Sequence, residues 1–343
     1  SADFCPFSSA LDPAIDDAAT FEEHLEAATR RTVECARRAE AAGVDLTGYS
    51  TIENARDVRA LRRALGLEQW NVWGISYGSI LGQAYIKEDA DGIRAVVLDA
   101  IMPLEIRGSD HYWRVVHWYV RDLVKMQEIC DGQPACAKRY PDMIGRLREA
   151  ARSVAEEPIA VTVKDTENYP SGTARFFSDI VAFLPFMLLY EQDNYPGVPG
   201  LIHAWADAVE QRDEDVFRAI ALASGDTGFG GQSEGMSNAI HCLDGGAAAQ
   251  TRAGLMDIAE YPVLGRSIGT QRSWQRHAAA CDELGMFQRP AEDYRATETD
   301  LPSVTVEGDM DPITPPPLAP AIATGFSNGT YFEFPSPGHA PSR

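Results

Sequence analysis

The chain has 343 residues, of which 45% are hydrophobic and 24% charged, and its net charge at pH 7 is −21. The hydrophobic share is ordinary for a globular protein, and the length indicates two domains or one large domain with an insertion. A surface this acidic repels nucleic acid. The most apolar stretch, residues 176–190, contains Asp179 and Pro185 and is too short to cross a bilayer. We therefore expect neither nucleic acid nor a membrane as a partner.

Helices and strands alternate in the N-terminal part of the chain. Apolar side chains recur at helical spacing over about residues 20–42 and 52–65, and each run stops near a glycine. Short apolar runs predict buried strands at residues 69–74 and 94–99, with a helix between them.

The rest of the chain is mainly helical in pattern until about residue 298. We expect helices at 111–126, 176–190 and 201–222, and a flexible Gly- and Ser-rich loop at 225–237. Strand character then returns at 303–307 and 330–334, again with a helix between the strands.

This order of elements predicts a mostly parallel α/β sheet interrupted by a helical insertion. We expect a core made of residues 1–103 and 299–343. Residues 104–298 are expected to form a helical cap inserted between the two core segments.

Six cysteines occur in the chain, and their spacing does not resemble a metal site. An even count of this kind indicates three disulfides and an oxidising compartment, and the alternative is six reduced cysteines in a cytosolic protein. A turn-rich segment separates Cys130 from Cys136, which favours that pair. The order along the chain then suggests the remaining pairs, Cys5–Cys35 and Cys242–Cys281.

The segment Gly74-Ile75-Ser76-Tyr77-Gly78 lies between the first predicted strand and the following helix. A strand leading in and a helix leading out are what a nucleophilic serine on a tight turn requires. We expect both glycines to be needed, because the turn leaves no room for side chains. The helix directs its N-terminal N–H groups toward the serine, so the Tyr77 N–H is the expected oxyanion donor. The alternative is an ordinary turn with a buried serine.

A nucleophilic serine needs a histidine base. His339 follows the last predicted strand, at the sheet edge where catalytic groups of α/β proteins gather. The other histidines fall in helical or insertion segments, where surface or packing roles are expected: His24, His111, His117, His203, His241 and His277.

The base in turn needs an orienting carboxylate. Asp309 and Asp311 directly follow the predicted strand at 303–307, and Asp99 follows an earlier strand. We expect Asp311 to be the acid, because the chain order serine, aspartate, histidine is that of the α/β-hydrolases. A plain turn at Asp311-Pro312 is the alternative.

With these motifs placed, the chain resembles the secreted tripeptidyl-aminopeptidase and proline-iminopeptidase-like branch of the α/β-hydrolases. The resemblance is looser in the insertion and is carried by these segments: 42–46, 55–57, 61–66, 73–79, 96–99, 308–315 and 338–339. It implies an α/β-hydrolase fold, a triad of Ser76, Asp311 and His339, and a cap that contains the Cys130–Cys136 loop and Cys242.

One feature of that family has no counterpart here. The family carries a His-Gly-Gly-Pro-Gly-type loop upstream of the serine, which supplies a second oxyanion donor, and nothing like it precedes Ser76. We therefore expect the N-terminal strands of the sheet to be missing, which exposes an edge beside the serine strand. Loss of one oxyanion donor lowers the turnover rate by a factor of about 10²–10³.

The expected function is that of a secreted serine exopeptidase that releases short N-terminal peptides or single residues. No signal-peptide pattern is present at Ser1, so we expect that a leader has been removed. The alternatives are an esterase or other small-molecule acyl hydrolase with the same triad, and a truncated hydrolase that only binds. The substrate is thus a peptide or an ester.

A carboxylate of the cap could hold the ammonium group of a peptide substrate, and Glu191, Asp193 and Glu234 are candidates. We expect no metal and no organic cofactor, because the chain has no zinc-type motif and no phosphate-binding loop.

Overall fold

The computed structural model describes most of the chain, namely residue 18 and residues 20–105, 113–165, 169–223, 233–267, 278–286, 288–319 and 324–342. Among these residues, no helix combines the length and the apolar character that crossing a membrane requires.

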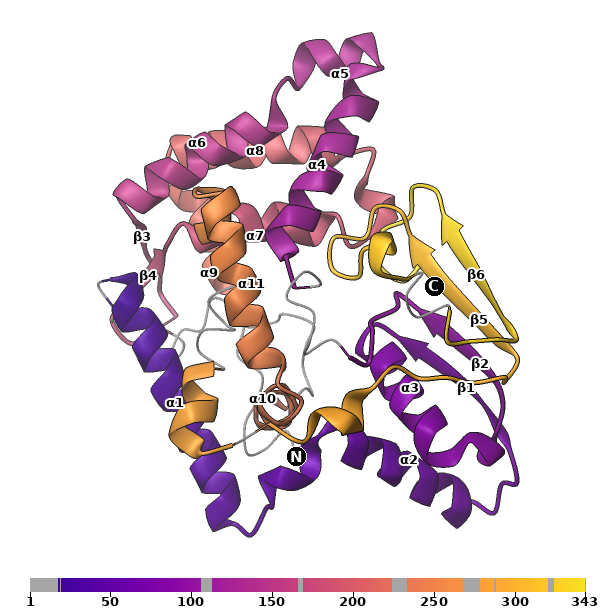
Figure 1. The fold of residues 1–343 in the computed structure, drawn as a ribbon. Coiled ribbons are helices and arrows are strands. Elements are labelled where there is room, and N and C mark those ends of the chain that lie inside the picture. The colour runs from indigo at the N-terminus through magenta and orange to yellow at the C-terminus, as the bar shows by residue number, and fades with distance from the viewer. Residues whose placement is uncertain are drawn as a thin grey trace.

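Four parallel strands form the main sheet, in the order β1-β2-β5-β6 (Figure 1). Their bounds are Trp70–Ile75 for β1, Ile93–Asp99 for β2, Ser303–Gly308 for β5 and Gly329–Phe334 for β6. Every adjacent pair runs parallel, so the carboxyl ends of all four strands meet at one edge. The four strands predicted from the sequence are confirmed, and so is the mostly parallel α/β sheet.

Two helices lie against one another beside the serine strand: α2 (Thr51–Ala64) and α3 (Tyr77–Asp89) (Figure 1). Helix α3 also packs on β1 and β2. A Cβ atom at Gly82 would lie only 2.8 Å from a methyl group of Leu98, so this glycine permits the close approach of α3 to β2.

The ends of the first helices agree with the sequence signals. Helix α1 (Phe21–Ala41) begins at a capping box, in which Thr20 and Glu23 bond reciprocally to each other's backbone N–H. The Ser50 side chain accepts from a backbone N–H in the first turn of α2. Gly43 and Gly66 follow these two helices with φ of +86° and +69°, values that favour glycine.

The described part between β2 and β5 is mainly helical, as expected (Figure 1). Its helices are α4 (Val115–Asp131), α5 (Pro134–Arg139), α6 (Met143–Glu156), α7 (Asp179–Leu188), α8 (Val198–Glu210), α9 (Glu214–Ala223), α10 (Glu234–Leu243) and α11 (Gly246–Glu260). Short 3₁₀ helices occur here and elsewhere, at Leu46–Tyr49 (η2), Ala90–Gly92 (η3), Gln192–Asn194 (η5), Leu264–Arg266 (η6), Ala291–Tyr294 (η7) and Pro316–Leu318 (η8).

The prediction of one helix over 201–222 is wrong, because the chain turns between α8 and α9. Arg212 adopts a φ of 50° at this turn, a conformation that no glycine marks in the sequence. The loop predicted at 225–237 is also wrong in its last residues: α10 begins at Glu234, and the Ser233 side chain caps it by accepting from the Met236 N–H. Residues 225–232 lie outside the described residues.

An antiparallel hairpin in the insertion was not predicted. Its strands are β3 (Ile159–Thr162) and β4 (Thr173–Phe176), so Phe176 belongs to a strand rather than to the helix expected at 176–190. Each strand has only four residues, too few for the alternation of buried and exposed side chains to stand out in the sequence.

Two of the expected disulfides are confirmed, Cys130–Cys136 and Cys242–Cys281. Cys35 is also disulfide-bonded. Cys5, which the sequence suggested as its partner, lies outside the described residues.

One cluster of buried apolar side chains extends from the sheet into the insertion. It includes Leu98 of β2 and Tyr85 of α3, together with Leu123 of α4 and Phe186 of α7. A second cluster surrounds the β3–β4 hairpin and includes Phe217 of α9. The sheet and the neighbouring insertion helices therefore share a core, which limits their relative motion.

One face of the main sheet carries exposed aromatic side chains. Strand pairing aligns Trp73 with Val97 and Val304, and it aligns Phe332 with Val306, so Trp73 and Phe332 share a face. Their side chains are 62% and 48% exposed. Among the described strands, β1 has a neighbour on one side only, so the serine strand lies at the sheet edge.

A matched pair of leucine substitutions tests this packing. Leu98→Ala removes a fully buried side chain between β2 and α3, and we expect the free energy of unfolding to fall by about 2–5 kcal/mol. Leu61→Ala removes a 54% exposed side chain of α2 and should change the free energy of unfolding by less than about 1 kcal/mol. Urea unfolding followed by circular dichroism measures both, and equal losses would contradict the described packing.

Candidate active site

Ser76 lies at the sharp turn between β1 and α3. Its backbone angles are φ 57° and ψ −122°, and a residue with a side chain adopts such a positive φ only where the surrounding structure enforces it. The Ser76 N–H donates to the carbonyl of Asp99 at 3.0 Å, which ties the turn to the end of β2. The serine is partly exposed at the carboxyl edge of the sheet.

The two glycines that flank the serine are not equivalent. A Cβ atom at Gly74 would lie 2.2 Å from the carbonyl oxygen of Gly78, so the turn cannot close over any larger residue at that position. A Cβ atom at Gly78 would have no neighbour within 4 Å. The expectation that both glycines are sterically required is therefore confirmed for Gly74 and wrong for Gly78.

Asp311 and His339 meet after β5 and β6. The His339 Nδ1 lies 2.8 Å from the Asp311 Oδ2, and the two side chains are 8% and 0% exposed. The other carboxylate oxygen accepts from the backbone N–H groups of Ile313 and Thr314 at 2.8 and 2.9 Å. The Thr314 hydroxyl donates to Oδ2 as well.

These contacts determine which nitrogen of His339 carries the proton. An ionised carboxylate can only accept hydrogen bonds, so the Nδ1 of His339 must be the donor to Asp311. In the neutral ring this leaves the Nε2 unprotonated and able to take up a proton. The pair thus has the geometry of a histidine base oriented by a buried acid.

The loops that carry Asp311 and His339 pack directly on one another. A Cβ atom at Gly308 would lie 2.2 Å from the carbonyl oxygen of Gly338, and the Met310 N–H donates to the Pro337 carbonyl at 3.0 Å. Beyond the histidine, the Ser342 N–H donates to the Asp99 carboxylate at 3.0 Å.

Asp99 therefore connects the two halves of the site. Its carbonyl oxygen holds the Ser76 N–H, and its carboxylate holds Ser342, three residues beyond His339. The structure brings Asp311 and His339 into direct contact, and it joins the segment after His339 to the serine turn through one residue.

The other two aspartates considered as the acid have different partners. The Asp309 carboxylate forms an ion pair with Lys125 of α4. The Asp99 carboxylate accepts from the backbone and the hydroxyl of Ser342. Of these three carboxylates, only that of Asp311 is hydrogen-bonded to His339.

Two tyrosines of the insertion, which the sequence did not indicate, hold the histidine loop. The His339 N–H donates to the Tyr190 carbonyl at 3.0 Å, and the two rings meet edge to face with their centroids 5.1 Å apart. The Tyr195 hydroxyl lies within hydrogen-bond distance of two carbonyl oxygens, that of Leu189 at 3.1 Å and that of Met310 at 3.3 Å. Nothing in the residue pattern of this segment marks such contacts.

Helix α4 also contacts the loop that carries Asp311. The Arg121 guanidinium donates to the carbonyl oxygens of Asp309 and Asp311 at 3.1 and 3.2 Å. The neighbouring Asp122 is fully buried beside this arginine, and burial raises the pKa of its carboxyl to about 7. The sequence indicated neither residue, because their positions depend on tertiary packing.

The described histidines other than His339 have packing partners. The His241 ring contacts Trp113, and complete burial lowers its pKa to about 4, so it is neutral near pH 7. His24 contacts Phe177, His117 contacts Trp118, and His203 contacts Tyr140. His111 and His277 lie outside the described residues.

Two of the three candidate carboxylates for a substrate ammonium are exposed. Glu191 and Asp193 are exposed, and Glu191 directly follows Tyr190. Glu234 begins α10, and its side chain lies outside what the structure describes. Over the described residues, no group of three or more potential metal ligands gathers at one place.

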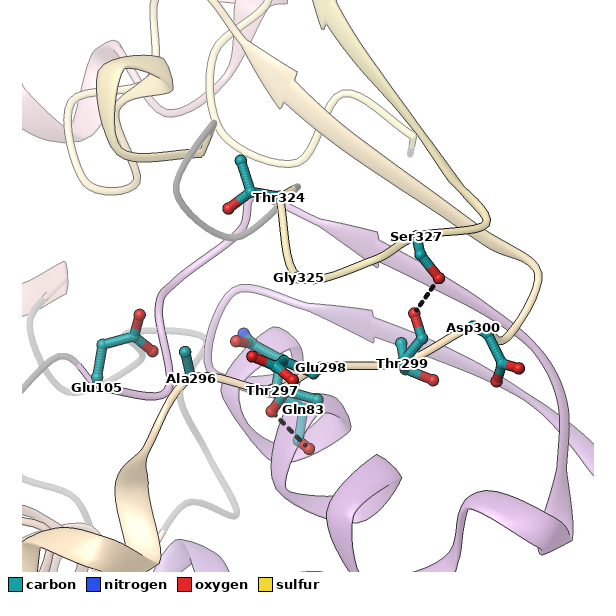
Figure 2. Close-up of a pocket in the computed structure, with 10 residues that line it drawn as sticks. All are labelled: Gln83, Glu105, Ala296, Thr297, Glu298, Thr299, Asp300, Thr324, Gly325 and Ser327. Carbon is teal, nitrogen blue, oxygen red and sulfur yellow. Dashed lines mark hydrogen bonds between the residues drawn. The ribbon is translucent and has the colours of Figure 1, made fainter.

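A hollow of about 500 Å³ lies beside α3, and Figure 2 shows residues that line it. None of the residues Ser76, Asp311 and His339 lines this hollow. Its carboxylates, those of Glu105, Glu298 and Asp300, are spread along the wall rather than directed at one point. The hollow is therefore separate from the Asp311–His339 pair, and the carboxylates that the structure describes around it do not converge.

Substitution of the two glycines tests the geometry of the serine turn. Gly74→Ala forces a carbon atom against the Gly78 carbonyl, so we expect a lower melting temperature and a displaced turn. Gly78→Ala places its methyl group in open space and should leave the melting temperature almost unchanged. Differential scanning calorimetry of both variants makes the comparison, and equal effects would show that the turn is not as tight as described.

The match to one protein-family model agrees with this architecture. The family model described as the α/β-hydrolase fold matches residues 28–124, which include β1, the serine turn, α3 and β2. A probable proline iminopeptidase of Streptomyces coelicolor is 36% identical over 64 residues. That match covers 19% of this chain and 20% of the relative, so the chain spans about a fifth of the length of this relative.

Solved structures of α/β-hydrolases are similar over a larger part of the chain but at low identity. An α/β fold family hydrolase from Bacillus anthracis str. Sterne is 14% identical, with a TM-score of 0.34, over 86% of this chain and 69% of the other. A thermophilic esterase from Thermogutta terrifontis is 15% identical, with a TM-score of 0.30, over 85% of this chain and 66% of the other. The parallel sheet, the serine turn between β1 and α3, and the match to the family model over residues 28–124 show an α/β-hydrolase fold.

Proposed function

We propose that the chain is a serine hydrolase in which Ser76 is the nucleophile, His339 the base and Asp311 the acid that orients the base. The observation that carries the proposal is the 2.8 Å hydrogen bond between the buried carboxylate and the imidazole. This pair lies at the sheet edge at which the strained serine turn is also located.

In the proposed reaction, the Ser76 hydroxyl attacks the carbonyl carbon of the substrate while the His339 Nε2 takes up its proton. The negative charge that develops on the carbonyl oxygen is stabilised by the Tyr77 N–H, at the N-terminus of α3. His339 then gives the proton to the leaving group, and an acyl-enzyme remains. Water releases the acyl group by the same steps, while Asp311 holds the ring and balances its positive charge.

We further propose that the substrate is a peptide with a free N-terminus. The resemblance to aminopeptidases around the serine and the histidine supports this specificity, as does the partial likeness to a probable proline iminopeptidase. The insertion contacts the histidine loop through Tyr190. In this position it would admit only the ends of peptide chains to the proposed site.

A carboxylate near the histidine would recognise the ammonium group of such a peptide. Glu191 is the candidate that the contacts favour, because it is exposed and adjoins Tyr190, whose ring packs on His339. The acidity of the whole chain, with a net charge of −21, also favours the approach of a cationic N-terminus.

We propose that the protein works in an oxidising compartment, as a secreted enzyme does. The disulfides Cys130–Cys136 and Cys242–Cys281 support this, since such bonds persist where thiols are not kept reduced.

A covalent label tests the proposed nucleophile. Treatment with a fluorophosphonate should add one phosphonyl group to the protein, and peptide mapping should locate it on Ser76. Ser76→Ala should abolish labelling, and Asp311→Asn should slow turnover by about 10⁴-fold, because the histidine then adopts the wrong tautomer. A wild-type protein that folds but takes up no label would overturn the proposal.

The substrate class is decided by comparing an aminoacyl or tripeptidyl arylamide with a short p-nitrophenyl ester. The proposed exopeptidase hydrolyses the arylamide, and it loses activity when the N-terminus of that substrate is acetylated. Turnover of the ester alone would identify an esterase with the same triad and contradict the peptidase assignment.

A further inference from the structure

The side chain of Tyr77, directly after the serine, is part of a buried chain of hydrogen bonds. Its hydroxyl lies 2.8 Å from the Oγ1 of Thr51 and accepts from the amide nitrogen of Asn54 at 3.3 Å. Thr51 in turn donates to Asp244, through its backbone N–H at 3.2 Å and through its hydroxyl at 2.5 Å. The Tyr294 hydroxyl donates to the same carboxylate.

The carboxylate at the Asp244 end of these hydrogen bonds determines which group is the donor in each of them. The Asp244 carboxylate can only accept, so the single hydroxyl proton of Thr51 points toward it. Thr51 therefore accepts from Tyr77, and the Tyr77 hydroxyl is a donor. Burial raises the pKa of Tyr77 to about 12, so this donor keeps its proton over the range in which the protein would work.

The chain joins parts of the protein that are far apart in the sequence. Thr51 begins α2, Tyr77 begins α3, and Asp244 follows α10 in the segment between β2 and β5. Asp244 lies two residues after Cys242, whose disulfide to Cys281 fixes this part of the insertion. Thr51, Asp244 and Tyr294 are 0%, 8% and 2% exposed, so these bonds are shielded from water.

Tyr77 has two roles in this arrangement. Its backbone N–H is the proposed oxyanion donor, and its side chain is the anchor at one end of the network. A donor is effective only when it is held within hydrogen-bond distance of the place where the negative charge develops. The orientation of the Tyr77 backbone therefore depends on what its hydroxyl is bound to.

We propose that Asp244 is a positioning residue for the reaction: through Thr51 and Tyr77, it holds the first residue of α3 so that the Tyr77 N–H meets the oxyanion. This inference rests on the proposed serine hydrolase function. It assigns to the insertion a part in turnover that is separate from substrate recognition, because Asp244 acts on the serine turn rather than on the substrate.

The sharpest test is a matched pair of substitutions at Thr51. Thr51→Val keeps the shape of the side chain but removes the hydroxyl that links Tyr77 to Asp244, so kcat for the arylamide should fall about 10- to 100-fold, with KM nearly unchanged. Thr51→Ser restores a hydroxyl and should regain most of the lost rate. The rate of fluorophosphonate labelling at Ser76 should follow kcat in both variants.

A double-mutant cycle then tests whether Asp244 acts along this route. Asp244→Asn and Tyr77→Phe should each lower kcat, and the double variant should lose no more than the worse single variant, because both changes break one chain. If Asp244→Asn does not fold, the cycle between Tyr77→Phe and Thr51→Val answers the same question. Losses that multiply in the cycle would overturn the inference.

Asp89→Asn is the matched control for a merely structural role. Asp89 is a buried carboxylate at the other end of α3, bonded to Arg62 at 2.7 and 3.0 Å and to Tyr85 at 2.8 Å. This variant should lower the melting temperature without changing kcat.

The outcomes separate this inference from the function on which it rests. If the wild type is labelled at Ser76 and Thr51→Val keeps the full kcat, the positioning role is wrong and the proposed function stands. If the wild type folds but is neither labelled nor active, the proposed function is wrong, and the inference fails with it.

Discussion

The backbone of Ser76 is held at a positive φ by contacts on both sides of the turn. Its N–H bonds to Asp99, and the Gly78 carbonyl approaches so closely that only a glycine fits at position 74. Strain of this kind costs about 1–3 kcal/mol and persists only where packing enforces it. The close contact of α3 with β2 at Gly82 supplies that packing, and it leaves the serine and the helix N-terminus at the same sheet edge.

Asp311 and His339 reach that edge from the C-terminal strands, and contacts with the insertion hold their loops. Arg121 bonds to the backbone of the acid loop, and Tyr190 bonds to the backbone of His339. The insertion is also linked to Tyr77, the residue after the serine, because Asp244 bonds to Thr51 and Thr51 bonds to the Tyr77 hydroxyl. The insertion thus contacts both halves of the proposed site, and it also shares one apolar cluster with the sheet.

The elements of the sheet could be predicted from the sequence because each has a local signal: apolar runs for the strands, glycines at the helix ends, and a glycine–serine turn between strand and helix. The Asp311–His339 contact followed from chemistry and chain order. The bend at Arg212 could not be predicted, because an arginine adopts there the conformation that usually marks a glycine. The contacts of Arg121, Tyr190 and Asp244 depend on how distant segments pack, which residue spacing does not encode.

In the proposed mechanism, Ser76, Tyr77 and His339 act on one reacting centre. A crystal structure of the phosphonylated protein tests this most directly. We expect phosphorus bonded to the Ser76 Oγ, a phosphonyl oxygen about 3 Å from the Tyr77 nitrogen, and the His339 Nε2 within hydrogen-bond distance of the adduct. Phosphorus on another residue, or an imidazole turned away from the serine, would contradict the account.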